Sequence, residues 1–181
     1  MKNRDRGLAA RFLAQARHSL AEHHLPRIAS CMRMLSTEDI WWRPHRTANS
    51  VGNLVLHLEG NVRQWMVSGL GGTPDTRQRQ REFSSRGSAG SRALLERLRR
   101  TVAKACRVLD QLSREDLARV YAIQGLRVTG LEAVSHVTEH FALHCGQIIY
   151  VTKLRKRSDL GFTRLPGEKP PPRATSRLPV I

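Results

Sequence analysis

The stretch HVTEHFALHCGQIIYVTKL, residues 136–154, predicts a long helix that carries an unusual polar ridge. His136, His140 and His144 recur at a strict spacing of four, so they share one side of the helix, and Gln147 extends that side. Apolar residues flank all of them, which places the ridge on or beside the buried face. An unsatisfied buried polar group costs on the order of 1–3 kcal/mol, so these imidazoles need partners.

A second helix, expected over residues 51–68, carries a matching set of polar side chains among apolar ones. Asn53, His57 and Asn61 recur at a spacing of four. A lone histidine such as His57 is more often a hydrogen-bonded core residue than a ligand. However, two histidines four apart on one helix can bind one metal ion, and a third imidazole from a facing helix completes an open tripod. The two helices together therefore favour a metal site.

Apolar periodicity predicts two further long helices, over residues 8–35 with an interruption at Pro26 and over residues 91–112. The helix that carries the histidine ridge is expected to begin at Thr129 and to end near residue 156. Thr129 and Glu132 have the spacing of a capping box, in which each side chain accepts a hydrogen bond from the other's backbone N–H.

Strand signals are weak throughout, and the best of them is RVYAIQGLRV, residues 119–128. We therefore predict an all-α chain with four principal helices. Its three connections are each about fifteen to twenty residues long, whereas helices in an up-down bundle are usually joined by roughly two to eight. Long crossover connections are expected. The connection over residues 71–91 is rich in glycine, serine and arginine, and a loop of this length is usually functional or mobile.

The bulk composition predicts one domain, over residues 1–162, followed by a Pro-rich tail, over residues 163–181, that we expect to be disordered. The formal net charge is +16, but the 31 basic residues are mostly arginines scattered over every segment. Nucleic-acid binding is therefore not expected, because it calls for a concentrated basic patch.

The three cysteines are odd in number and never form a CxxC pair, which argues against a disulfide framework and against a thiolate zinc site. The N-terminus lacks the apolar run of a signal peptide, and no stretch approaches the length of a membrane span. These features predict a cytoplasmic protein without a membrane partner.

Three stretches closely resemble the DinB-like superfamily (damage-inducible DinB and YfiT-like proteins), and within it a bacterial branch long described as a domain of unknown function. They are NSVGNLVLHLEGNVRQWM at 49–66, GGTPDTRQRQREF at 71–83 and the histidine-bearing stretch at 136–154. The similarity covers roughly residues 8–162. It implies a four-helix bundle of DinB type, often dimeric, so we expect a homodimer.

The resemblance also implies a divalent metal held by one histidine of the second helix and by two positions four apart on the fourth, here His57, His140 and His144. The four-apart row extends about 12 Å along the helix, so all its histidines cannot easily reach one ion. We choose His140 and His144, and the alternative pair is His136 and His140. Residues expected to orient the ligands or to line the pocket are His136, Gln147, Asn61, Asn53 and Trp42.

Three residues next to the expected ligands in sequence have predicted roles apart from metal binding. Gly60 either allows a close helix contact, which we favour, or leaves room beside the ion. Glu59 is expected in a solvated or salt-bridged surface position. Cys145 is expected to be a core thiol, because it follows His144 and so points away from the metal.

Three neutral imidazoles leave a divalent ion with its full charge and an open position. By resemblance, the leading hypothesis is a thiol-dependent S-transferase that acts on small electrophiles in stress response or detoxification. It would use zinc, or else nickel, iron or manganese, with a low-molecular-weight thiol as cosubstrate. The ligands also permit hydrolysis by a metal-bound hydroxide. An alternative of another class is a non-catalytic, basic binding module with a structural metal. No catalytic acid or base stands out.

Overall fold

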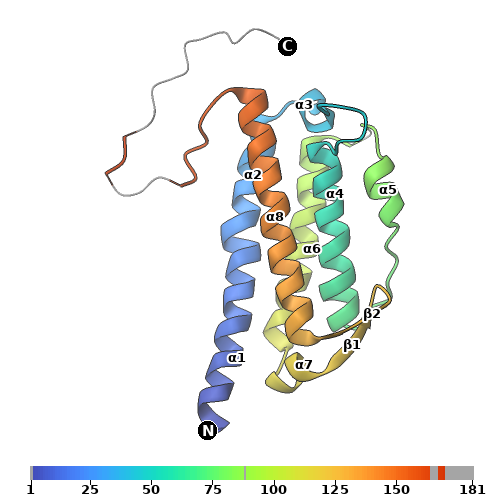
Figure 1. Cartoon of the computed structure of the whole chain (residues 1–181), viewed down its shortest axis with the longest axis vertical. Helices are drawn as coiled ribbons and strands as arrows, with labels where there is room; N and C mark the ends of the chain where they lie inside the picture. Colours follow the sequence, from blue (N-terminus) through green and yellow to red (C-terminus); the bar gives the residue numbers. More distant parts are fainter. Residues whose placement is uncertain (1, 88, 164–166, 170–181) are drawn as a thin grey trace.

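Four long helical rods lie side by side in the computed structural model, which describes residues 2–87, 89–163 and 167–169 (Figure 1). The first rod comprises α1 (Lys2–Arg17), the π-helix η1 (His18–His24) and α2 (Leu25–Met34). The second comprises α4 (Val51–Val62) and the π-helix η2 (Arg63–Leu70). The others are α6 (Ser91–Gln111) and α8 (Gly130–Lys156). The predicted all-α class with four principal helices is confirmed.

The first rod is one continuous helix, and Pro26 neither breaks it nor separates two helices. The wide turns of η1 end directly before α2, which has Pro26 in its first turn. A proline is tolerated there because it has no N–H to donate and disturbs only the turn before it. The second rod ends at Leu70, two residues beyond the expected end.

The connections carry short elements of their own. The first contains α3 (Thr37–Trp41), the second contains α5 (Arg79–Ser84), and the third contains α7 (Arg114–Ala118), β1 (Val120–Ile123) and β2 (Leu126–Thr129). The weak strand signal is real, since β1 and β2 form an antiparallel hairpin in which Val120 pairs with Thr129. Its turn residues Gln124 and Gly125 both have positive φ, as a two-residue hairpin turn requires.

The rods run up, down, down and up. The segment between η2 and α6 therefore passes back along the bundle as a crossover, whereas the other two connections join rods at one end (Figure 1).

Side-chain caps fix where several of the helices begin. Thr129 and Glu132 form the expected capping box of α8, while Ser36 with Asp39 and Ser113 with Asp116 cap α3 and α7.

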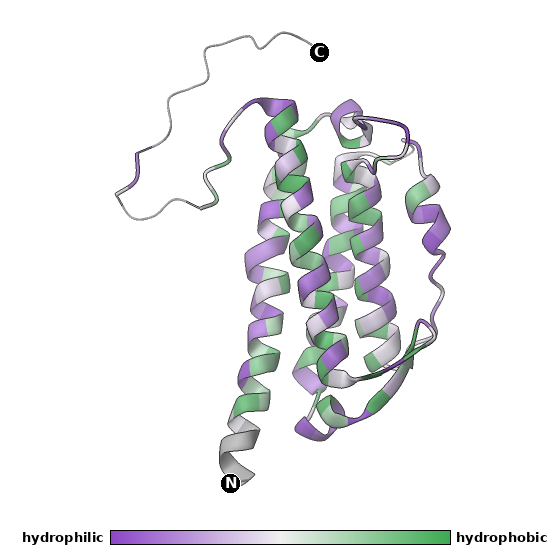
Figure 2. Ribbon diagram, in the orientation of Figure 1, coloured by the Kyte–Doolittle hydropathy of each residue, from purple (hydrophilic) through white to green (hydrophobic). Residues whose placement is uncertain are grey.

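Apolar side chains of all four rods form one core, which includes Leu20, Ile28, Leu58, Leu98 and Phe141 at zero exposure. Figure 2 shows the hydrophobic and hydrophilic residues alternating along each rod, as expected for helices with one buried face. Across the described residues, no helix is long and apolar enough to cross a membrane. Most of the predicted disordered tail, 163–181, lies outside the described residues.

Candidate metal centre

Two rods that contact each other, α4 and α8, bring three imidazoles together. The Nε2 atoms of His57 and His140 are 3.0 Å apart, and those of His140 and His144 are 3.1 Å apart. All three possible ligand atoms lie within 4.8 Å of one another. His57 is buried and the other two are half-buried, so the cluster lies between the rods and near the surface of α8.

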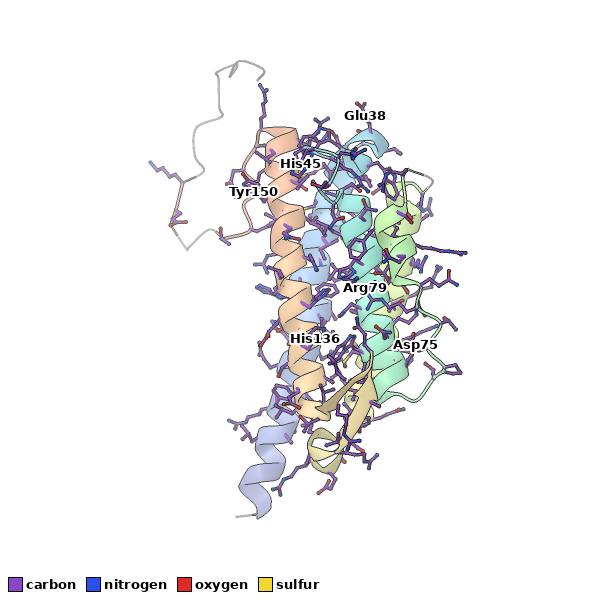
Figure 3. The ribbon with its side chains drawn as sticks, turned by 45° about the vertical axis from the view of Figure 1, so that its right-hand side comes forward. Glu38, His45, Asp75, Arg79, His136 and Tyr150 are labelled. Atoms are coloured by element: carbon purple, nitrogen blue, oxygen red, sulfur yellow. The ribbon has the colours of Figure 1, made fainter. Side chains whose placement is uncertain are left out.

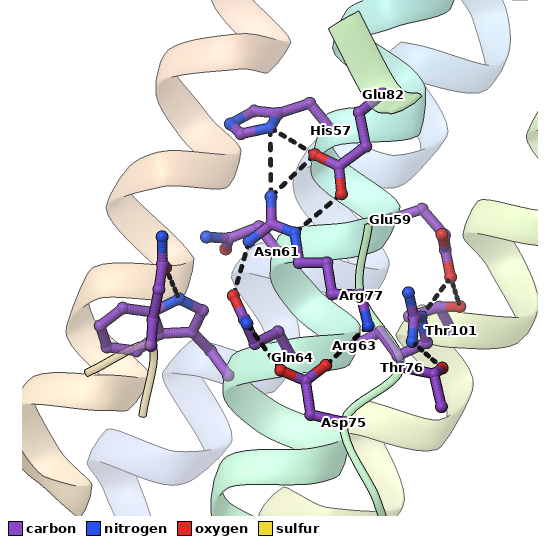
Figure 4. A network of polar contacts seen from close by, with 12 residues as sticks. His57, Glu59, Asn61, Arg63, Gln64, Asp75, Thr76, Arg77, Glu82 and Thr101 are labelled. Carbon is purple, nitrogen blue, oxygen red and sulfur yellow. Dashed lines mark hydrogen bonds and ion pairs between the residues drawn. The ribbon is translucent and has the colours of Figure 1, made fainter. Parts of the chain in front are cut away.

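The ring of His57 is oriented by an ion pair from the crossover. Its Nδ1 lies 2.8 Å from Oε2 of Glu82, whose carboxylate also accepts bonds of 2.7 and 2.8 Å from Nε and Nη2 of Arg77 (Figure 4). A carboxylate can only accept, so Nδ1 of His57 carries the proton and donates it to Glu82. The lone pair of His57 is therefore on Nε2 and points at the cluster.

His144 is oriented in the same way by a residue of its own helix. Its Nδ1 lies 2.7 Å from Oε1 of Gln147, one turn further along α8. The amide oxygen accepts the Nδ1 proton, which leaves the lone pair of His144 on Nε2. The same division of roles, with one nitrogen fixed by an acceptor and the other free to bind, is typical of metal-ligating histidines.

His140 completes the cluster and has no such partner. Its Nδ1 is buried without a hydrogen bond to any described residue, and its Nε2 faces both other rings. A proton on Nε2 could serve only one of the two lone pairs that point at it. A cation at the centre could bind all three nitrogens. Nitrogens around a tetrahedral zinc ion are about 3.3 Å apart, close to the spacings seen here.

The surroundings favour the neutral form of His140 and His144. Burial, together with the neighbouring rings of His144 and His57, lowers the pKa of His140 to about 3. Burial also lowers the pKa of His144, and the bond to Gln147 opposes that effect only in part. Burial raises the pKa of Glu82, but the bonds from Arg77 and His57 outweigh it, so this pKa falls below its ordinary value. Neutral imidazoles are the form that binds a metal ion.

His136 lies one turn away and is engaged elsewhere. It projects from α8 toward the second rod (Figure 3), where its Nε2 lies 3.2 Å from Nδ2 of Asn61. Its ring also packs against Trp65, with 4.0 Å between the ring centroids. His136 does not belong to the group of three that could share one ion.

The remaining expected site residues are not at the cluster. Asn53 caps α4 and donates a 2.7 Å bond from Nδ2 to the backbone oxygen of Glu82, so it holds the crossover in place. Trp42 packs under the guanidinium of Arg155, at 5.0 Å from the ring centroid. That position on α8 is roughly 16 Å beyond His144 at 1.5 Å per residue, so Trp42 lies near the C-terminal end of the helix, whereas the cluster is near its middle.

Sequence reasoning missed Glu82 and Arg77, because neither has a helical spacing relative to the histidines. The one local signal was Gly60. A Cβ atom there would lie 2.0 Å from Oε1 of Glu82, so the glycine makes room for this carboxylate. The prediction that Glu59 lies at the surface is wrong, because this residue is salt-bridged but only 4% exposed. It accepts bonds from Thr101 and from Arg97.

Comparisons with known proteins concern the family and the fold of the chain. Residues 7–168 match the family model described as "Protein of unknown function (DUF1572)". No curated protein matches the chain.

Three solved structures share the fold. A DinB-like protein from Bacillus cereus is 12% identical with a TM-score of 0.60, over 74% of this chain and 87% of that one. A DinB-like protein from Bacillus subtilis is 20% identical with a TM-score of 0.61, over 81% and 94%. A conserved protein from Enterococcus faecalis is 18% identical with a TM-score of 0.59, over 82% and 95%.

Proposed function

This chain belongs to the DUF1572 family and has the fold of DinB-like proteins, and on that basis we propose that it binds a divalent metal ion through His57, His140 and His144. We further propose that the bound ion serves a thiol-dependent S-transferase reaction on small electrophiles, in stress response or detoxification. Zinc is the proposed ion, because neutral imidazoles suit it.

One observation carries the metal proposal. Two imidazoles whose Nδ1 protons are held by Glu82 and Gln147 direct their lone pairs at the Nε2 of a third. Such a convergence is unfavourable unless a cation binds it. The buried ion pair of Arg77 with Glu82 is arranged to keep His57 in this orientation, which a purely structural core histidine would not require.

A divalent ion among neutral imidazoles keeps its full charge and an open position, where it lowers the pKa of a bound water or thiol toward neutrality. The chain's own cysteines are poorly placed to supply that thiol. All three are buried and free, and burial raises the pKa of Cys145 to about 11, with its Sγ directed at the backbone oxygen of His24. The proposed thiol is therefore a separate small molecule.

Aromatic rings pack on His57 and on the neighbouring His136. The ring of Phe83 packs on His57 at 4.7 Å between centroids, and Trp65 packs on His136 beside the cluster. Flat apolar walls of this kind suit a small electrophile with an apolar body. In the proposed reaction, these rings exclude water while Glu82 and Gln147 hold the imidazoles in position.

Substitution with Co²⁺ tests the proposal. Metal-free protein is loaded with one equivalent of Co²⁺, and its absorption spectrum is recorded as a small thiol is added. A thiolate bound at the open position adds a sulfur-to-cobalt charge-transfer band, which His144→Ala should abolish. An unchanged spectrum at saturating thiol would overturn the transferase proposal and leave hydrolysis as the chemistry that the same ligands permit.

A further inference from the structure

A second polar pocket lies outside the histidine cluster, where the crossover passes over the second rod and α6. It has a volume of about 350 Å³, and its walls include Arg63, Arg81, Arg97, Thr76, Ser85 and Glu82. Arg63 comes from η2, Arg97 from α6, and the other four from the crossover. Three separate elements therefore point cationic or hydroxyl side chains into one space, which we call the arginine pocket.

The carboxylates next to the arginine pocket are already fully engaged. Both oxygens of Glu82 accept bonds from Arg77 and His57. Both oxygens of Glu59 are likewise occupied. Oε1 accepts a hydrogen bond from Thr101, and Oε2 accepts bonds of 2.7–2.9 Å from Arg97. Arg63 also pairs with Oε1, at 3.4 Å. Neither acid has a free oxygen to offer the pocket.

The guanidiniums, in contrast, have donors to spare. Arg81 forms no side-chain hydrogen bond or ion pair with any residue in the described part of the chain, although it lines the pocket. Arg63 uses Nε for Glu59 and Nη1 for Thr76, and Arg97 uses Nε and Nη2 for Glu59. Four guanidiniums, counting Arg77, face two carboxylates, so about two positive charges remain uncompensated.

We propose that the arginine pocket binds the phosphate group of a small phosphate monoester. Such a group carries close to two negative charges at neutral pH and accepts several hydrogen bonds at once. Guanidiniums are positively charged, and their planar fork of N–H donors can bond two phosphate oxygens together. The hydroxyl of Thr76 accepts a hydrogen bond from Arg63 and so keeps its own proton as a further neutral donor. The pocket is larger than a bare phosphate needs, and the side chain of Leu56 gives it an apolar wall for an organic group.

Binding there adds a link between the crossover and the second rod, which Thr76 and Arg63 already join at 2.8 Å. The phosphate bridges Arg81 on one side to Arg63 and Arg97 on the other, and so links α5 to η2 and α6. Arg81 is next to Glu82 in the chain. A bound phosphate therefore steadies the segment that carries Glu82, without touching the three histidines.

Titration calorimetry on the full-length, metal-free protein tests the proposal, with glycerol phosphate as the probe and chloride as the balancing salt at constant ionic strength. We expect saturable binding at one site, with glycerol giving none. Arg81→Ala should weaken binding about tenfold or more, because a charged hydrogen bond is lost. The matched control is Arg99→Ala, which removes the same charge from α6, where Arg99 pairs with Glu96 outside the pocket.

Arg81→Ala should fold normally, because the side chain has no partner in the described structure to lose, and its melting temperature is recorded alongside. No saturable binding by the wild type would overturn the proposal. Equal loss in Arg81→Ala and Arg99→Ala would also overturn it, since that result indicates a general attraction to a protein of net charge +16. Because the metal is absent throughout, neither result bears on the histidine cluster.

Discussion

The three histidines of the cluster differ in the hydrogen-bond partner that orients each ring. His57 depends on a carboxylate that comes from a distant part of the chain, whereas His144 depends on Gln147, one turn away on the same helix. Partners of this kind fix the tautomer of a ligand and raise its basicity, and their loss typically costs 10–100-fold in metal affinity. Among the described residues, His140 has polar contacts with the other two rings alone, and the ring of His136 stacks on it at 5.6 Å between centroids.

Gln147 offers the cleanest test of such a partner, because it is exposed and its replacement should not disturb the core. Gln147→Ala should weaken Zn²⁺ affinity about tenfold, since the His144 ring loses the acceptor that fixes its tautomer. Gln147→Glu keeps an acceptor for the Nδ1 proton and should retain the affinity. Competition with a chromophoric chelator measures both variants. Equal affinity in wild type and Gln147→Ala would show that the hydrogen bond has no role in binding.

Gly60 is the residue whose lack of a side chain matters most here. Gly60→Ala places a methyl group against the Glu82 carboxylate, which Arg77 and His57 hold in a buried position. We expect a loss of roughly 1–3 kcal/mol in the free energy of unfolding, measured with urea on metal-free protein.

The matched control is Gly7→Ala, because a Cβ at this helical position meets nothing within 4 Å. That variant should gain up to about 1 kcal/mol from the better helix propensity of alanine. If Gly60→Ala were as stable as Gly7→Ala, the carboxylate would have to be free to move.

At the scale of elements, one buried carboxylate ties the short helix α3 to the end of α8. Asp39 caps α3 and also pairs with Arg155 and Lys156. The bond from Lys156 lowers the pKa of Asp39 most, burial opposes it, and the bonds from Arg155 and Ser36 add to the lowering, so the pKa lies well below its ordinary value. The charged form therefore stabilises the folded state above about pH 4, and this contribution is lost as the pH falls.

Asp39→Asn should accordingly cost roughly 1–3 kcal/mol at pH 7, because two cations lose their buried partner. It should also flatten the fall in stability of the wild type between about pH 5 and pH 2. Urea unfolding across that range checks both expectations. Asp110→Asn is the control, because Asp110 is mostly exposed and its ion pair with Arg17 is long, at 3.6 Å. Parallel pH curves for wild type and Asp39→Asn would contradict this account.

The elements that could be predicted are those whose signal is local. The box of Thr129 and Glu132 marked the start of α8 because a cap is a contact between residues three apart. The hairpin gave a weak signal because its strands are four residues each, too short for a clear alternation. The π-helical turns of η1 and η2 have no comparable pattern, since they depend on how the rods pack.

The residues of the candidate site also divide into those that the sequence could identify and those that it could not. His57, His140 and His144 were identified by spacing and by resemblance, and the structure brings all three together. Glu82 and Arg77 could not be identified, because their positions depend on the path that the crossover takes over α4. Trp42 and Asn53 were chosen for their place in sequence or in helical phase, and the structure places Trp42 against Arg155 and Asn53 against the backbone of Glu82.

On the scale of the whole molecule, the bundle explains how a site forms between rods that are far apart in sequence. His57 and His140 are 83 residues apart and meet because α4 and α8 run side by side. The arrangement leaves the other expectations as predictions, namely a homodimer, a small-molecule substrate, a cytoplasmic location and no nucleic-acid partner. They concern the partners and the surroundings of the protein, which the structure of a single chain does not contain.

The most direct test of the central claim is the metal content of protein purified without a polyhistidine tag. The wild type should hold close to one equivalent of a divalent metal, after reconstitution with Zn²⁺ if needed. His57→Ala and His144→Ala should remain folded by circular dichroism and lose the metal, whereas His136→Ala should keep it. A wild type that binds no metal after reconstitution would contradict the account, and so would metal lost from His136→Ala but retained in His144→Ala.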